Sequence, residues 1–297
     1  MVGARVWPRW PNMTVATPAA PVGISVNLYL MSDPRLLYRH NDDGFLIEVI
    51  EEVGMRSLYF SGCHLQSRQW LEKPWALLLP YTSYMMAFPL IGMAEPKRAL
   101  LIGVGGGSIA HFLRRHFSEC QLDAVDISAT ILQTACDFFG LQEDDFLRLH
   151  CRDGGRFLRD SNALYDLILL DAFDGDGMAE ELYAKPFFTE AEKHLSKDGI
   201  FCGNLWSNQA ARRRRVFRQL RDSFADTIFL PVPDRGNIIS LSGASPLPWR
   251  ESCADRERLA ELSDRFGLDF FTMAEVTLRH NGGKNERGGF WRRLMPG

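Results

Sequence analysis

A short glycine-rich segment constrains the fold of this chain more than any other feature. The apolar run Ala99-Leu-Leu-Ile leads directly into Gly103, Gly105, Gly106 and Gly107, and a helical pattern follows. An unbroken apolar run is typical of a strand that is buried on both faces of a parallel sheet. Glycines are needed where a tight turn brings the backbone close to a ligand, and the N–H groups of the next helix attract a polar or anionic group. A glycine loop alone also occurs as a plain structural turn, so its meaning depends on the surrounding pattern.

The sequence around this loop alternates between strand and helix patterns. The expected strands are 99–102, 121–125, 147–150, 166–170, 199–205, 227–230 and 237–242. The expected helices between them are 109–117, 128–139, 186–195 and 212–224. This alternation predicts an α/β fold with a Rossmann-like, doubly wound and mainly parallel sheet.

We expect this nucleotide-binding catalytic domain to span residues 96–245. Residues 1–24 are rich in proline and small residues, which predicts a disordered tail. Residues 25–95 predict an N-terminal β-element, with a hairpin formed by 45–50 and 56–60, followed by a connecting helix that begins at Tyr81. Residues 246–297 predict a C-terminal tail with one helix over 255–266.

Composition excludes several classes of protein. The net charge is −3 and the pI is about 6.2, so the chain has no overall positive field that would attract nucleic acid or an anionic membrane surface. No apolar run approaches the roughly 20 residues that span a bilayer. The six cysteines form no C-x-x-C pair, which is typical of reduced thiols in the cytoplasm, and the seven histidines form no metal-binding motif. We therefore expect a cytoplasmic protein without a metal, a nucleic acid partner or a membrane anchor.

Two acids follow the second and third strands of the expected sheet. Asp126 ends the strand after the glycine loop, and the pair Asp153-Gly154 follows the next strand. Ligands of such sheets bind beyond the carboxyl ends of the strands. Asp126 is placed to accept the ribose hydroxyls of a nucleotide, and Asp153 is placed to hold an adenine edge. Ser108 stands where a dinucleotide fingerprint has glycine or alanine, which favours an adenosyl sulfonium over NAD.

A cluster of carboxylates follows the fourth strand. Asp171, Asp174 and Asp176 are close together in the sequence at the mouth of the same sheet. A sulfonium donor and an amine acceptor are both cationic, so carboxylates attract both. An alkylammonium with a pKa near 10 must lose a proton before its nitrogen can attack, and a carboxylate within hydrogen-bond reach can accept that proton. Such acids also occur as capping residues of turns.

From about residue 44 to residue 244, the chain resembles the spermidine synthase (polyamine aminopropyltransferase) family, and in particular a divergent, spermidine synthase-like branch with a class I methyltransferase-like fold. The glycine loop, Asp126, the Asp153-Gly154 pair and the segment Asp171-Ala-Phe-Asp174 occur in the order of the family's motifs. The last segment resembles the family's D-S-S-D loop. Upstream, Gln66 is similar to the glutamine of the family's hairpin, and Tyr81 is similar to the tyrosine of its Y-[HQ]-E element.

The resemblance implies transfer of an aminopropyl group from decarboxylated S-adenosylmethionine to a small-molecule amine or polyamine, without a metal. Asp171 would accept the proton with help from Tyr81, and Asp174 would hold the amine. The donor would be bound by Gly103, Gly105, Gly106, Gly107, Asp126, Asp153, Gly154 and Gln66.

The chain departs from the family pattern at several positions. Gly106 stands where the family has an aspartate that holds the donor's amine, and Thr82 and Ser83 follow the tyrosine in place of His or Gln and Glu. Without that acid, selectivity for a donor lacking a carboxylate is reduced. Two alternatives therefore stay open: a small-molecule methyltransferase that uses ordinary S-adenosylmethionine, and a catalytically idle nucleotide-binding protein of the same fold. The retained acids after the fourth strand argue against the idle protein.

Two further features favour ordinary structural roles. Six arginines between residues 212 and 221 are expected on the solvent-exposed face of a helix rather than in a phosphate site. Trp70 and Trp75 favour core packing or a homodimer contact over an acceptor pocket.

Overall fold

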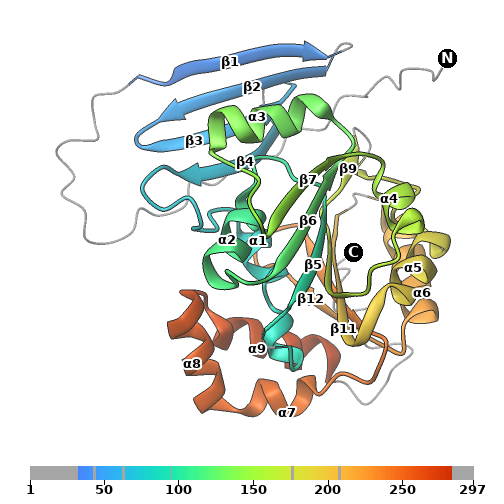
Figure 1. Cartoon of the computed structure of the whole chain (residues 1–297). Helices are drawn as coiled ribbons and strands as arrows, with labels where there is room; N and C mark the ends of the chain where they lie inside the picture. The colour runs from blue at the N-terminus through green and yellow to red at the C-terminus, as the bar shows by residue number, and fades with distance from the viewer. Residues whose placement is uncertain are drawn as a thin grey trace.

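Seven strands form the central sheet, in the order β12-β13-β11-β8-β5-β6-β7 (Figure 1). The computed structural model describes residues 33–42, 45–61, 64–93, 95–174, 177–206 and 209–282. The strands are β5 (Arg98–Ile102), β6 (Gln121–Asp126), β7 (Leu147–Cys151), β8 (Tyr165–Leu170), β11 (Leu195–Leu205), β12 (Asp226–Pro231) and β13 (Ile238–Gly243). The first five of these run parallel, whereas β13 is antiparallel to both β11 and β12. The predicted mainly parallel, doubly wound sheet is confirmed.

The strands follow the apolar runs because helices cover both faces of the sheet. In β8, every side chain from Leu167 to Leu170 is fully buried. The helices are α2 (Ser108–His116), α3 (Ala129–Phe139), α4 (Gly154–Asp160), α5 (Lys185–Lys193) and α6 (Ala210–Ser223). The core on one face takes residues from α2 and α3, and the core on the other face takes residues from α4, α5 and α6. Helix α4 was not predicted, because it is short and its first two residues are glycines, which are poor helix formers.

A second sheet of four antiparallel strands lies beside α3 (Figure 1). Its strands are β1 (Arg35–Asp42), β2 (Phe45–Glu52), β3 (Met55–Phe60) and β4 (His64–Trp70). The predicted hairpin is the central pair, and its two turn residues, Val53 and Gly54, have φ values of 51° and 73°, as a tight two-residue hairpin turn requires. The core that this sheet shares with α3 consists of Ile47, Val49, Leu58, Ile131 and Phe139. This packing fixes the N-terminal sheet to the helix that follows Asp126.

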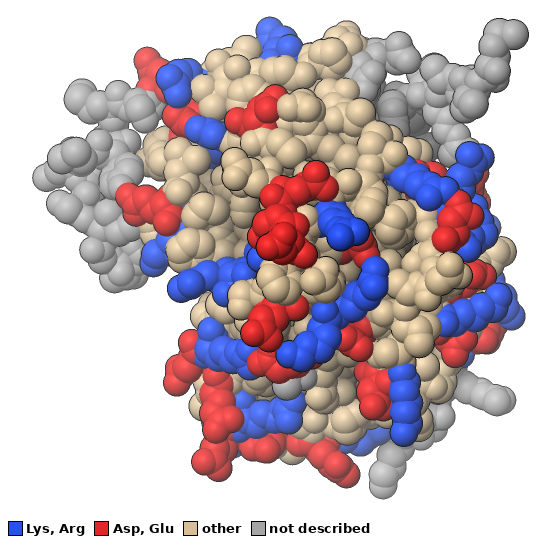
Figure 2. All heavy atoms as spheres, in the orientation of Figure 1, with Lys and Arg blue, Asp and Glu red and all other residues tan. Residues whose placement is uncertain are grey.

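Two short helices, α1 (Pro80–Met85) and the 3-10 helix η1 (Phe88–Ile91), connect the two sheets. The hairpin formed by β9 (Phe173–Asp174) and β10 (Gly177–Met178) follows β8. Within the described residues, no helix has both the length and the apolar character needed to cross a membrane. The predicted tail at residues 1–24 lies outside the described residues. Over the face seen in Figure 2, lysine and arginine side chains are interspersed with aspartate and glutamate.

The described part of the C-terminal segment, residues 246–282, contains three helices where the sequence predicted one. They are α7 (Trp249–Ala254), α8 (Arg256–Phe266) and α9 (Phe270–Asn281). Asn281 holds α9 against the edge strand β12, because its amide nitrogen donates to the Phe229 carbonyl at 2.9 Å and its amide oxygen accepts from the Phe229 N–H at 3.0 Å. Helix α9 was missed because its phenylalanine, valine and threonine residues weaken a helical pattern that tertiary packing stabilises.

Candidate active site

The predicted glycine loop lies at the carboxyl end of β5, in direct contact with the loop that follows β8. Gly103 has a φ of 91°, and its N–H donates to the Val125 carbonyl of β6 at 2.9 Å. A Cβ atom at Gly103 would lie 2.3 Å from the carbonyl oxygen of Asp171, so only glycine fits at this point. The Asp171 N–H in turn donates to the Ile102 carbonyl at 2.8 Å. The chain therefore brings the predicted nucleotide loop and the predicted proton acceptor together through backbone contacts.

The remaining glycines of the loop lie against strand β4 and helix α2. Gly105 and Gly107 have φ values of 54° and 78°, and Gly107 is the N-cap residue of α2. The Gly106 N–H donates to the Ser67 hydroxyl oxygen at 2.8 Å. A Cβ atom at Gly106 would lie 2.8 Å from the Ser67 Cβ, so strand β4 occupies the space that a side chain at position 106 would need. Ser67 was not predicted from the sequence, because its partner lies 39 residues away.

Asp126 supports the glycine loop in addition to the role predicted for it. Its Oδ2 accepts the Val104 N–H at 2.9 Å, and its Oδ1 accepts the Ser128 N–H at 3.0 Å. Burial raises the pKa of this carboxyl, whereas the hydrogen bonds from Ser128, Val104 and Gly105 lower it. An ionised carboxylate offers about four acceptor positions, and these backbone hydrogen bonds use most of them.

The loop after β7 places two predicted residues at the same edge of the sheet. Asp153 is the N-cap residue of α4, where its Oδ1 accepts the Arg156 N–H at 2.8 Å. Gly154 allows α4 to start close to β5, since a Cβ there would lie 2.5 Å from Cγ2 of Ile102. Ile127, beside Asp126, has 68% of its surface exposed, although it is large and apolar. An exposed isoleucine next to this acid is the kind of surface on which a planar adenine packs, and the sequence analysis had not singled it out.

Asp171 is held by side chains from two other elements. Its Oδ1 accepts a hydrogen bond of 2.8 Å from the amide nitrogen of Asn204, at the carboxyl end of β11. The Tyr81 hydroxyl of α1 forms a second hydrogen bond with this carboxylate. Burial raises the pKa of Asp171 to about 6, although both hydrogen bonds favour the ionised form. Burial and the charge of Asp171 raise the pKa of Tyr81 well above its usual range, so Tyr81 keeps its proton and acts as the donor.

Asn204 is itself held in place by neighbouring groups. The amide nitrogen of Asn237, just before β13, donates to its Oδ1 at 3.0 Å, and the Tyr183 hydroxyl donates to its backbone carbonyl at 2.7 Å. Asn204 and Asn237 were not predicted from the sequence. One signal was available: Asn204 is a polar residue near the carboxyl end of an apolar strand, as Asp126 is.

For two other predicted residues, Gln66 and Asp174, the structure gives the backbone position. Gln66 lies in β4 at a β-bulge, because Leu58 pairs with Ser67 and Tyr59 pairs with Leu65. Such bulges re-aim side chains and are frequent near active sites. The backbone of Asp174 pairs with Gly177 in the β9–β10 hairpin, whereas its side chain and residues 175–176 lie outside what the structure describes. The role of Asp174 therefore stays a prediction.

The residues at this edge fit an adenosyl ligand. Asp126 offers a carboxylate at the end of β6, and the neighbouring Ile127 offers an exposed apolar surface. Across the described ranges, no group of three or more His, Cys, Asp or Glu side chains is arranged to hold a metal ion.

Comparison with known proteins identifies relatives of this chain. Residues 78–229, which run from α1 into β12, match the spermine/spermidine synthase domain. The polyamine aminopropyltransferase of Chromobacterium violaceum is 33% identical over 225 residues, which cover 75% of this chain and 86% of that protein. The polyamine aminopropyltransferase of Neisseria meningitidis serogroup B is 31% identical over 228 residues, which cover 76% of this chain and 87% of that protein.

Solved structures share the fold at lower sequence identity. A spermidine synthase in complex with the transition-state analogue AdoDATO has a TM-score of 0.68 and 15% identity, with 88% of each chain covered. The spermidine synthase of Thermotoga maritima has a TM-score of 0.65 and 14% identity, with 82% of this chain and 84% of that chain covered. The domain match and the two relatives show that this chain belongs to the spermine/spermidine synthase family.

Proposed function

We propose that this chain is an aminopropyltransferase that moves the aminopropyl group of decarboxylated S-adenosylmethionine to an amine nitrogen of a polyamine. Its family, and the names of its relatives, make it a transferase of this kind. The observation that carries the proposal is the Asp171 carboxylate, which Tyr81 and Asn204 hold beside the glycine loop.

The reaction requires a nucleophile, a leaving group and a proton acceptor. The acceptor nitrogen forms a bond to the aminopropyl carbon that is attached to sulfur, and the carbon–sulfur bond breaks. The sulfur leaves with the bonding electron pair, as the neutral thioether of methylthioadenosine. The attacking nitrogen must also lose one proton. An alkylammonium, with a pKa near 10, has no free electron pair with which to form the new bond.

Asp171 is suited to accept that proton. A carboxyl with a pKa of about 6 is ionised at pH 7 and above, yet it binds a proton more readily than an ordinary aspartate does. The Tyr81 and Asn204 hydrogen bonds fix the carboxylate, so that much of the catalytic effect is orientation of the amine toward the donor. Asp174, in the same loop, would hold the ammonium group of the acceptor.

The donor would be held by the groups at the carboxyl ends of β5, β6 and β7. Its ribose hydroxyls would bind Asp126, its adenine would pack on Ile127 with its amine toward Asp153, and its sulfonium would lie near the glycine loop. Gln66, at its bulge in β4, would contact the tail of the donor. Because residue 106 is a glycine, the loop presents no acid of its own to the donor's ammonium. Ser67 occupies the space beside this glycine. We therefore propose weak discrimination between decarboxylated and ordinary S-adenosylmethionine.

The small-molecule amine would be the main partner of this enzyme, and we place the enzyme in the cytoplasm. The cysteines among the described residues are all unpaired, and Cys120, Cys202 and Cys253 are buried, which is consistent with a reducing compartment. The homodimer suggested by Trp70 and Trp75 stays a prediction.

Calorimetric titration tests the proposed ligands. We expect methylthioadenosine and both forms of the donor to bind one site per chain, with affinities for the two donors within about tenfold of each other. Binding of ordinary S-adenosylmethionine with rejection of the decarboxylated form would instead favour a methyltransferase. If none of the three binds, the assignment of the nucleotide site is wrong.

A further inference from the structure

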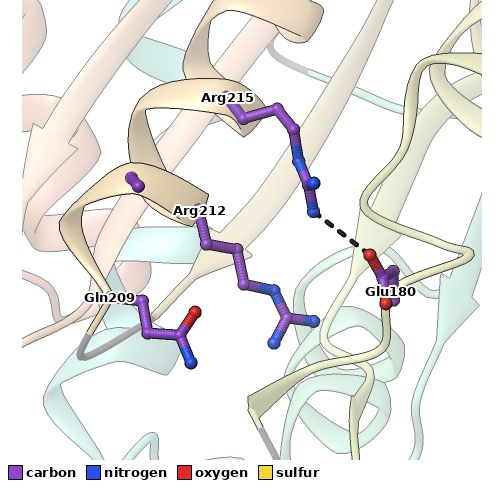
Figure 3. A pocket seen from close by; sticks show the side chains of 5 residues that line it. Glu180, Gln209, Arg212 and Arg215 are labelled. Atoms are coloured by element: carbon purple, nitrogen blue, oxygen red, sulfur yellow. Dashed lines mark hydrogen bonds and ion pairs between the residues drawn. The ribbon is translucent and has the colours of Figure 1, made fainter.

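An open cavity of about 620 Å³ lies between the start of α6 and the segment that follows the β9–β10 hairpin (Figure 3). It is lined by Glu180, Gln209, Ala211, Arg212 and Arg215. Small-molecule sites commonly have volumes of about 300–1,000 Å³, so this cavity has room for an organic molecule and not merely for a single ion. Among the described residues that line it, none is assigned to the proposed reaction.

Two arginines give the cavity its chemical character. Arg212 and Arg215 are three residues apart, so they lie on the same face of α6, and Figure 3 shows both guanidinium groups extending from the helix toward Glu180. Arg212 donates to the carbonyl oxygen of Met178 in β10, which fixes its head group at the wall of the cavity. The described lining contains these two arginines and one glutamate, so its five residues together carry a net charge of +1.

The ion pair across the cavity can be exchanged for a ligand. A guanidinium nitrogen of Arg215 lies 3.2 Å from a carboxylate oxygen of Glu180. The exposed fraction of the side chain is 55% for Arg215 and 73% for Glu180. Ion pairs this exposed contribute about 0–1 kcal/mol, so an incoming anion can replace Glu180 as the partner of Arg215 at little cost. A planar guanidinium forms parallel hydrogen bonds with a carboxylate or a phosphate, which makes arginine well suited to such a ligand.

The same charges exclude the amine acceptor from this cavity. A polyamine is cationic near neutral pH, and the two arginines would repel it. The cavity is nevertheless close to the reacting groups, because Met178 pairs with Phe173 and the Ala179 N–H donates to the Ala172 carbonyl at 3.3 Å. It is therefore a neighbour of the catalytic loop with the opposite preference for charge.

We propose that this cavity is a binding site for a small organic molecule that carries a phosphate or carboxylate group. Arg212 and Arg215 bind the oxyanion, and the Gln209 side chain lies at the same wall to contact a polar part of the ligand. The proposal rests on the described lining residues alone, and it does not depend on the proposed transfer reaction.

The test uses citrate and inorganic phosphate as probes of the two oxyanion types. Each is titrated calorimetrically into the full chain, at an ionic strength held constant with chloride. We expect saturable binding of at least one of them at one site per chain, and the stronger binder identifies the preferred group.

Three single variants then locate the site. Arg215→Gln should weaken binding about tenfold, since it removes a charged hydrogen-bond donor. Glu180→Gln should strengthen binding roughly two- to fivefold, because it removes the competing carboxylate. Arg218→Gln is the matched control: it removes the same charge from an exposed position of α6 outside the cavity lining, and it should leave binding unchanged.

Several results would overturn the proposal. Absence of saturable binding of both probes would do so, and so would an equal loss of affinity in Arg215→Gln and Arg218→Gln, which would indicate a general effect of surface charge. Because every readout is anion binding without turnover, failure here leaves the transferase proposal intact, and failure of the transferase proposal leaves this one intact.

Discussion

Replacement of Asp171 by asparagine should stabilise the fold while it removes activity. Burial raises the pKa of this carboxyl from 3.8 to about 6. The folded chain therefore binds the proton more tightly than the unfolded chain does, and the stability that Asp171 contributes is present below about pH 4 and is lost as the pH rises through 6. At 1.36 kcal/mol per pKa unit, the ionised group lowers the free energy of unfolding by at most about 3 kcal/mol. The residue is not completely removed from water, so we expect about 1–2 kcal/mol.

Asparagine is nearly isosteric with aspartate and carries no charge. Its oxygen can still accept from Asn204, and its amide can donate to the Tyr81 oxygen. Urea unfolding should therefore show Asp171→Asn to be about 1–2 kcal/mol more stable than the wild type at pH 8, with roughly half of this gain at pH 5 and little of it at pH 4. Turnover should fall by about 10²–10⁴-fold, because the proton acceptor is lost. Methylthioadenosine should bind with nearly normal affinity.

Asp264→Asn is a matched control, because Asp264 is an exposed carboxylate on α8. Its effect on the free energy of unfolding should be small at all three pH values. A variant Asp171→Asn that is less stable than the wild type at pH 8, or that gains equally at pH 4 and pH 8, would contradict the argument from burial. Full activity of this variant would refute the assignment of Asp171 as the base.

Four further predictions concern the donor, the acceptor and the pH profile. Asp126→Ala should weaken methylthioadenosine binding by about 1.5–3 kcal/mol, or roughly 10- to 150-fold, and unchanged calorimetric affinity would show that the ribose lies elsewhere. Gly106→Asp alone should weaken donor binding, because the new Cβ would overlap Ser67. The double variant Ser67→Gly with Gly106→Asp should instead favour the decarboxylated donor. An unchanged ratio of the two donor affinities in this double variant would show that position 106 does not face the donor's tail. Asp174→Asn should raise the KM for the acceptor more than it lowers kcat in steady-state assays, and the reverse pattern would argue against amine binding by this residue. In the wild type, kcat should fall as the pH drops through about 6. Asn204→Ala should move this fall in kcat to higher pH, because the variant removes a hydrogen bond that stabilises ionised Asp171. If the fall stays at the same pH, another group titrates.

The sequence could predict the sheet and the acids at its edge because both depend on local patterns. The glycine loop, Asp126 and Asp171 each directly follow an apolar strand, and the carboxyl ends of parallel strands meet at one edge of a sheet. The N-terminal hairpin was predictable for a similar reason, since Gly54 interrupts two apolar runs and marks the turn between them.

Contacts between distant segments could not be predicted in the same way. Ser67 and Gly106 are 39 residues apart, and Asn204 and Asp171 are 33 residues apart, so no local pattern links either pair. The arginines of α6 were expected on a solvated face, and only the structure shows that Arg212 and Arg215 share a cavity with Glu180. Even the predicted role of Asp126 was incomplete, because its bonds to the loop backbone depend on how β6 lies beside β5.

Product analysis of the wild-type enzyme tests the central claim most directly. The enzyme is incubated at pH 8 with decarboxylated S-adenosylmethionine and a diamine or polyamine, and the products are separated and identified by mass spectrometry. We predict an amine that has gained one aminopropyl group, together with an equal amount of methylthioadenosine. An amine that remains unmodified with this donor, or one that instead gains a methyl group from ordinary S-adenosylmethionine with release of S-adenosylhomocysteine, would contradict the account.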